Sequence, residues 1–358
     1  MPAWRVDGVF LPGGDSGTGG VDGRGRWTPT PPDGAEPLPG RFVLPGLVDA
    51  HCHLSVGPGP GGRPRPLTEG QARANLKAAR AAGVAVVRDL GGPGGVALRL
   101  LADEDGAGLI ACGRFLAPRD RYFPGVYTPV ASGDLVEAAL AEVAAGARWV
   151  KLVGDFPPVG RGVLRASDAV PTYPAADVRR LVAAVHGAGA RVAAHTTTSH
   201  AGELIAAGVD SIEHGDGMSE ADVASLAERG GAWTPTLCAT VAPPSGGEDA
   251  EGRRARLRRR ERMAHLLRAA RAAGVPILTG TDVVGGIAEE VALLVELGLP
   301  PAEALAAAST AAAEFLGVPG GLRPGRPANL VCYAGDPRDD AAVLARPTAV
   351  VVAGRRIV

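Results

Sequence analysis

Two histidines stand one residue apart in a chain where histidine is scarce. His51 and His53 lie in the segment "LVDAHCHL", residues 47–54, and the 358-residue chain has seven histidines. Side chains two residues apart on a β-strand point to the same face, so both imidazoles would point one way and Cys52 the other. Imidazole nitrogens bind Zn2+, Fe2+, Mn2+ and Co2+. The pair is therefore a candidate metal site, although an H-x-H motif alone is a weak signal.

Further ionisable residues fall within or at the ends of other apolar runs. These residues are Lys151 in "WVKLVG", His195 in "RVAAHT", His214 in "VDSIEHG" and Asp282 in "ILTGTD". If the runs are parallel strands of one barrel, their carboxyl ends lie at the same face and the side chains there converge. Imidazoles and a carboxylate together form a ligand set for divalent metals.

Lys151 does not fit such a site as a simple cation, because an ammonium aimed at a dication would be strongly repelled. Either its side chain extends out of the barrel mouth, or its neutral amine reacts with CO2. The second route gives a carbamate, an anion whose two oxygens can bridge two metals. The lysine therefore raises the question of whether the site holds one metal or two.

Apolar runs and helical patterns alternate along most of the chain. The candidate strands occupy residues 42–50, 84–90, 108–116, 148–154, 191–196, 209–215, 231–237 and 275–282. Segments with apolar residues at helical spacing separate them, and several end in glycine, as helices commonly do. This alternation predicts an α/β fold with a (β/α)8 TIM barrel. The alternative, an open doubly wound sheet, calls for a G-x-G-x-x-G motif after the first strand, and the sequence has none there.

The two ends of the chain have a different pattern. Turn-rich segments such as "PGGDSGTGG" lie near the N-terminus, and short β-like runs such as "TAVVVAGRRIV" lie near the C-terminus. We expect both ends to form strands of a small β unit beside the barrel. The predicted boundaries are residues 1–44 and 323–358 for this unit and residues 45–322 for the barrel.

Composition argues against several functional classes. A net charge of −1 gives no general attraction to nucleic acid or to an anionic membrane. The sequence has no apolar run of the roughly 18–20 residues that a membrane span needs, and its N-terminal segment lacks a secretory pattern. Four scattered cysteines fit a reducing compartment. We expect a cytoplasmic protein with a small-molecule substrate, no nucleic-acid partner and no membrane contact, and we leave a homo-oligomer open.

One basic run, "RRARLRRRERM", covers residues 253–263. We interpret it as the solvated start of the helix before the last strand, with Leu257 on its inner side. A contact for an acidic partner or for another subunit is the alternative. The run has no interleaved aromatic residues, which argues against base stacking.

In family order and over nearly the whole chain, these segments resemble the amidohydrolase superfamily, in the branch of imidazolonepropionase-like and Xaa-Pro dipeptidase-like enzymes. The resemblance rests on "VLPGLVDAHCHL", "WVKLVG", "VAAHTTT", "AGVDSIEHG", "ILTGTD" and "LRPGRPANLVCYAGDP". It implies metal-dependent hydrolysis in a TIM barrel. It also implies that the N- and C-terminal segments form a small β-sandwich domain.

The resemblance further implies a role for each candidate residue. The ligands of one metal would be His51, His53 and Asp282, and those of a second metal would be His195 and His214. A carbamylated Lys151 would bridge the two ions, for which Zn2+ is expected first and Fe2+, Mn2+ or Co2+ are alternatives. A metal-bound hydroxide would attack a carbonyl carbon, with Asp282 as general base and then general acid.

Two loops depart from the family pattern, and we expect substrate recognition there. The segment "APRDRYFPGVY" has no histidine, and the loop after Lys151 lacks the Gly-Gly run of many relatives. Arginine offers a planar fork for a carboxylate-bearing substrate. The candidate substrate contacts are Arg119, Arg121, Tyr122, Arg161 and, after the fifth strand, His200, which either lines the pocket or caps a helix.

Three functional hypotheses follow from the sequence. The first is hydrolysis of an amide, a cyclic amide or a related non-peptide C–N bond. The second is an Xaa-Pro-type dipeptidase. The third belongs to another class, a metal-binding barrel without a hydrolytic role.

Overall fold

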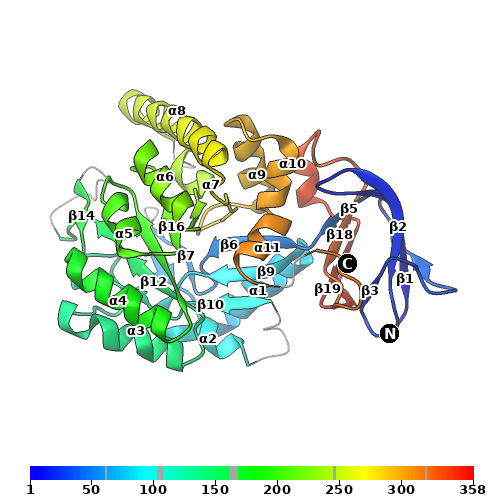
Figure 1. The fold of residues 1–358 in the computed structure, drawn as a ribbon, viewed down its shortest axis with the longest axis horizontal. Coiled ribbons are helices and arrows are strands. Elements are labelled where there is room, and N and C mark those ends of the chain that lie inside the picture. Colours follow the sequence, from blue (N-terminus) through cyan, green and yellow to red (C-terminus); the bar gives the residue numbers. More distant parts are fainter. Residues whose placement is uncertain (61–62, 103–107, 161–167, 245–246, 319–320) are drawn as a thin grey trace.

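Strands and helices alternate through the middle of the chain, as the sequence predicts (Figure 1). The computed structural model describes all residues except 61–62, 103–107, 161–167, 245–246 and 319–320. The central strands are β6 (Leu47–Cys52), β9 (Val84–Asp89), β10 (Leu109–Ala111), β11 (Phe115–Leu116), β12 (Trp149–Val153), β15 (Arg191–Thr196), β16 (Ser211–His214) and β17 (Ala232–Thr234). Nearly all their residues are buried, which explains why they read as continuous apolar runs.

These strands pair in parallel and in chain order. One sheet has the order β10-β9-β6 and another the order β11-β12-β15-β16-β17. The predicted eighth strand, residues 275–282, is present only as two isolated parallel bridges, Trp233 to Ile277 and Cys52 to Asp282. It thus connects β17 to β6. The fold is α/β, with sequential parallel strands whose carboxyl ends lie at the same face.

The helices follow the strands and lie on the outside of the sheets in Figure 1. They are α1 (Glu69–Ala81), α2 (Val96–Leu100), α3 (Leu135–Ala144), α4 (Ala175–Gly187), α5 (Ala201–Ala207), α6 (Glu220–Glu228), α7 (Leu237–Thr240), α8 (Ala250–Ala273), α9 (Ile287–Glu296), α10 (Pro301–Ala307) and α11 (Thr310–Phe315). Capping boxes start two of them, with Thr68 before α1 and Ser219 before α6. None of the helices in the described part of the chain combines the length and the apolar character that a membrane crossing needs.

The basic run lies on α8, which begins earlier than the sequence pattern suggests. Leu257 is 43% exposed, so the prediction that it faces inward is wrong. The buried stripe of α8 begins only at Met263 and continues with Leu266, Leu267 and Ala270. The N-terminal half of the helix therefore has no apolar face against the sheet, and the hydrogen bond of the Asp249 side chain to Gly252 starts it instead.

Both ends of the chain combine in one eight-stranded sheet, at the right of Figure 1. Its strands are β1 (Trp4–Phe10), β2 (Asp15–Val21), β3 (Trp27–Thr28), β4 (Glu36–Pro37), β5 (Phe42–Pro45), β18 (Leu330–Tyr333), β19 (Ala349–Val352) and β20 (Arg355–Arg356). β5 joins the two ends, because it pairs with β1 on one side and with β18 on the other. The joint β unit is thus present, and its arrangement as a sandwich stays a prediction.

Candidate metal centre

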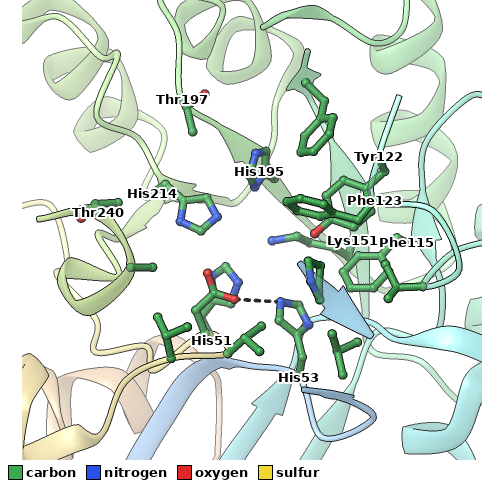
Figure 2. Close-up of a pocket in the computed structure, with 18 of the residues that line it drawn as sticks. His51, His53, Phe115, Tyr122, Phe123, Lys151, His195, Thr197, His214 and Thr240 are labelled. Carbon is green, nitrogen blue, oxygen red and sulfur yellow. Dashed lines mark ion pairs between the residues drawn. The ribbon is translucent and has the colours of Figure 1, made fainter. Parts of the chain in front are cut away.

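The side chains singled out in the sequence converge in one pocket at the carboxyl ends of the parallel strands (Figure 2). The pocket has a volume of about 550 Å3. Its lining includes all six predicted ligands, His51, His53, Lys151, His195, His214 and Asp282. Lys151 comes from the middle of β12, and the others come from the end of a strand segment or from just beyond it. The parallel order of the strands thus brings residues 231 positions apart together. The sequence-based grouping of these six residues is therefore reproduced.

Three of the four imidazoles use Nδ1 to hold their orientation. Nδ1 of His51 lies 2.8 Å from Glu213 Oε2, and Nδ1 of His53 lies 2.8 Å from the Gly91 carbonyl oxygen. Carboxylate and carbonyl oxygens only accept hydrogen bonds, so both Nδ1 atoms carry the proton. In the neutral rings, Nε2 is then a free lone-pair donor.

His214 is oriented in the same way through a hydroxyl group. Its Nδ1 lies 2.6 Å from Thr236 Oγ1, and that hydroxyl donates to the Pro235 carbonyl oxygen over 2.8 Å. Because the hydroxyl proton is committed, the threonine oxygen accepts from Nδ1. The Nε2 atom of His214 is thereby also free to bind a metal.

Donor atoms approach one another closely enough to share an ion. One ligand atom each from His51, His214 and Asp282 lies within 4.8 Å of the others. Asp282 Oδ1 is also 3.4 Å from His53 Nε2, and the rings of His195 and His214 have centroids 4.5 Å apart. The resemblance assigns His51 and Asp282 to one metal and His214 to the other. Because their donor atoms lie this close together, the two ligand sets form one continuous cluster.

Lys151 lies in the middle of this cluster. Its side chain is 1% exposed, and Nζ has no hydrogen-bond partner among the described residues. Figure 2 shows the amino group pointing toward the histidines, which rules out the alternative that it extends out of the mouth. Burial lowers the pKa of Lys151 to about 8, which favours the neutral amine relative to an exposed lysine.

Burial keeps the imidazoles neutral. It lowers the pKa of His53 to about 3 and that of His195 to about 4, and the charge of Lys151 adds to both shifts. The pKa values of His51 and His214 are lowered as well, first by burial. Neutral imidazole is the form that binds metals. Burial also raises the pKa of Asp282 to about 6, which suits a carboxylate that exchanges protons near neutral pH.

Backbone strain accompanies two of these side chains. His214 has φ of 66° and Asp282 has φ of 54°, in the left-handed region that costs non-glycine residues about 1–3 kcal/mol. Hydrogen bonds hold both. The Asp282 amide donates to the His51 carbonyl oxygen over 2.7 Å, and the Trp233 indole donates to the His214 carbonyl oxygen over 2.7 Å.

A buried ion pair behind His51 was not foreseen from the sequence. Arg88 and Glu213 are both fully buried, with Arg88 Nη2 2.9 Å from Glu213 Oε1. Arg88 also lies over the ring of Trp149, 4.6 Å from its centroid. A charged residue inside the apolar run "VAVVRDL" was the available signal, because a strand buries an arginine only beside a partner.

The pocket has two unlike walls. Aromatic rings of Phe115, Tyr122, Phe123 and Phe156 form one, with neighbouring centroids 4.8 to 5.2 Å apart. Polar residues lie on the other, where Arg259 contacts both Asp216 and Thr240. Figure 2 shows Thr240 on the opposite side of the histidines from the labelled aromatic residues.

The five predicted substrate contacts are placed differently from one another. Tyr122 lines the pocket, whereas Arg119 is exposed and Arg121 binds the carbonyl oxygens of Val170 and Pro171. His200 is buried outside the lining, with Nδ1 3.5 Å from the Glu203 carboxylate. Arg161 lies outside the described residues. Of the predicted substrate contacts that the structure describes, only Tyr122 lines the pocket.

Comparisons with known proteins show a family and a shared fold. The model of the amidohydrolase family matches residues 42–357. An uncharacterized protein of Mycobacterium tuberculosis is 38% identical over 345 residues, which cover 92% of this chain and 90% of that protein. A solved prolidase complexed with N-methylphosphonate-L-proline is 23% identical with a TM-score of 0.81, over 99% of both chains. A solved Xaa-Pro dipeptidase with bound methionine is 22% identical with a TM-score of 0.79, also over 99% of both.

Proposed function

Because the chain belongs to the amidohydrolase family, we propose that it is a metal-dependent hydrolase of a non-peptide C–N bond, such as an amide or a cyclic amide. The observation that carries the proposal is the buried, unpartnered Nζ of Lys151 in a cluster where three of the four imidazoles have Nδ1 committed elsewhere. As the supporting fold, we propose a closed (β/α)8 barrel over residues 45–322. A β-sandwich from residues 1–44 and 323–358 would flank it.

The donor set fits divalent metals. Neutral imidazoles and a carboxylate are ligands of Zn2+, and also of Fe2+, Mn2+ and Co2+. An unpartnered amine is costly in a buried site, and a carbamate on Lys151 would turn that cost into two anionic donor oxygens. We propose two ions. His51, His53 and Asp282 would hold one, His195 and His214 the other, with carbamylated Lys151 between them.

The residues of the pocket divide the chemistry among them. When bound, a divalent metal supplies Lewis acidity, which lowers the pKa of a water and polarises a carbonyl oxygen. Asp282 accepts a proton from the attacking water on a carboxylate oxygen and delivers it to the leaving nitrogen. Its side chain is 19% exposed, so it reaches both the ligand cluster and the open part of the pocket. The aromatic wall makes one side of the pocket apolar.

Replacing Asp282 tests this division. Asp282→Asn keeps the shape and one donor oxygen but cannot take up the proton. We expect an activity loss of about 10²–10⁴-fold with metal content unchanged, measured as turnover in a metal-loaded screen of amides, lactams and N-acyl amino acids. Asp33→Asn, at an exposed turn, is the control and should keep full activity. Full activity in Asp282→Asn would refute the proposed role.

An Xaa-Pro-type dipeptidase is the second candidate, favoured by the names of the two solved structures described above. At 22% and 23% identity that likeness concerns the fold. A panel of Xaa-Pro dipeptides beside the amides and lactams separates the two activities. A metal-loaded protein inert toward the whole panel would instead support a non-hydrolytic metal-binding barrel.

A further inference from the structure

Besides Lys151, the described lining of the pocket contains a second cationic side chain, Arg259 of α8. Its Nε lies 3.0 Å from Asp216 Oδ2, and Nη1 donates to the Thr240 carbonyl oxygen over 3.4 Å. Nη2 makes no hydrogen bond to any residue that the structure describes. The guanidinium is therefore held in place on one side and free to bind on the other.

The position of Arg259 gives the pocket a direction. Its partner Thr240 lies across the histidines from Phe115 and Tyr122 (Figure 2). A substrate whose scissile bond lies over the histidines and Lys151 therefore extends toward aromatic rings at one end. Toward the other end it meets a guanidinium.

We propose that Arg259 determines specificity by binding a substrate carboxylate, so that the enzyme acts on N-acyl amino acids with an apolar acyl group. This inference rests on the proposed function and names the substrate class of the same site. Guanidinium donors match the two oxygens of a carboxylate, and they bind it with strong, directional hydrogen bonds. Asp216 fixes Nε, so little side-chain freedom is lost when the substrate binds.

The negative charge of Asp216 offsets part of the attraction. Arg259 is 39% exposed, so solvent screens the remaining charge attraction between the guanidinium and a carboxylate. Recognition therefore depends more on the hydrogen bonds of Nη1 and Nη2 than on net charge. An arginine at this position should consequently bind the substrate carboxylate much more tightly than a lysine would. This distinction can be measured.

Binding is tested with N-benzoyl-L-alanine and its neutral counterpart N-benzoyl-L-alaninamide. Both are titrated by calorimetry into metal-loaded protein that carries Asp282→Asn, so that neither probe is consumed. We expect the acid to bind at least about tenfold more tightly than the amide. Adding Arg259→Gln should bring the ratio close to one by weakening the acid, and Arg259→Lys should leave an intermediate ratio.

Arg258→Gln is the matched control, since Arg258 is the exposed neighbour on α8 and does not line the pocket. It should leave the ratio unchanged. A ratio that survives Arg259→Gln overturns the inference, because the carboxylate would then bind elsewhere, for example to the metals. A parent protein that binds neither probe, or binds the amide as well as the acid, overturns it too.

Turnover by the protein with intact Asp282 separates this inference from the proposed function. If the protein hydrolyses the probes but the binding ratio does not change with Arg259, the proposed hydrolase function stands. The proposed role of Arg259 is then wrong. If the binding ratio depends on Arg259 but no substrate of the panel is hydrolysed, the carboxylate site stands. The proposed hydrolase function is then wrong.

Discussion

At the scale of single residues, partners outside the pocket decide which atoms face into it. Glu213 accepts from Nδ1 of His51 with one carboxylate oxygen and binds Arg88 with the other. The Ser211 hydroxyl also donates to it. This carboxylate therefore both sets the tautomer of His51 and neutralises a buried guanidinium.

Glu213→Gln should damage metal binding and stability together. The amide cannot balance Arg88, and an uncompensated buried charge costs about 3–5 kcal/mol. Loss of the carboxylate behind His51 should weaken metal affinity about 10–100-fold. Chelator competition measures the affinity and urea unfolding measures the free energy, with Glu203→Gln on the exposed face of α5 as the control. An unchanged metal affinity would show that Glu213 is not an orienting residue.

The residues that we propose as ligands were predictable one by one from the sequence, while their hydrogen-bond partners were not. His51 and His214 each end an apolar run, so a strand-end rule finds them in the sequence. Arg259 escaped that rule because it lies mid-helix in a basic run, and only the packing of α8 brings it to the pocket. Glu213 escaped it because no sequence pattern pairs it with Arg88, 125 residues away.

At the scale of elements, the turn after β15 depends on one buried carboxylate. Asp155, in the short strand β13 (Asp155–Phe156), accepts from the backbone amides of Thr197 and Thr198 over 3.0 and 3.3 Å. The hydroxyls of Thr196, Thr197 and Thr198 also donate to it. Because His195 directly precedes these residues, Asp155 positions the end of the strand that carries it.

Asp155→Ala should therefore loosen this turn. Two partly buried backbone amides would lose their acceptor, at up to about 1–3 kcal/mol each. We expect a loss of at least about 2 kcal/mol in the free energy of unfolding, measured in urea on the metal-free protein. Asp33→Ala at an exposed turn should change stability by less than about 0.5 kcal/mol. Equal stability of the two variants would contradict the positioning role.

The positions of the strands were predictable from the sequence within a few residues. Whether a predicted strand forms one unbroken strand was harder to predict. The predicted strand at residues 191–196 coincides with β15, which follows the glycine-bearing end of the preceding helical pattern. The predicted strand at residues 108–116 is divided into β10 and β11 around Gly113, whose φ is 77°. A glycine inside a strand pattern often marks a bend, so Gly113 was the signal in the sequence for this break.

At the scale of the whole molecule, sequential parallel strands gather donors from distant parts of the chain. β6, β12, β15 and β16 each contribute a proposed ligand, and Asp282 reaches the cluster through its bridge to Cys52. The order of the strands could be predicted from their alternation with helices. The joint sheet of the two chain ends could be predicted as a β unit, but its pairing through β5 depends on long-range contacts.

The central claim is that this cluster holds two divalent ions around Lys151, and an anomalous-diffraction map of zinc-loaded crystals tests it most directly. We predict two peaks in the pocket, one against His51, His53 and Asp282 and one against His195 and His214. Extra density on Lys151 Nζ should show the carbamate. A map without a peak among these side chains would contradict the account, and a single peak with an unmodified lysine would contradict its two-metal form.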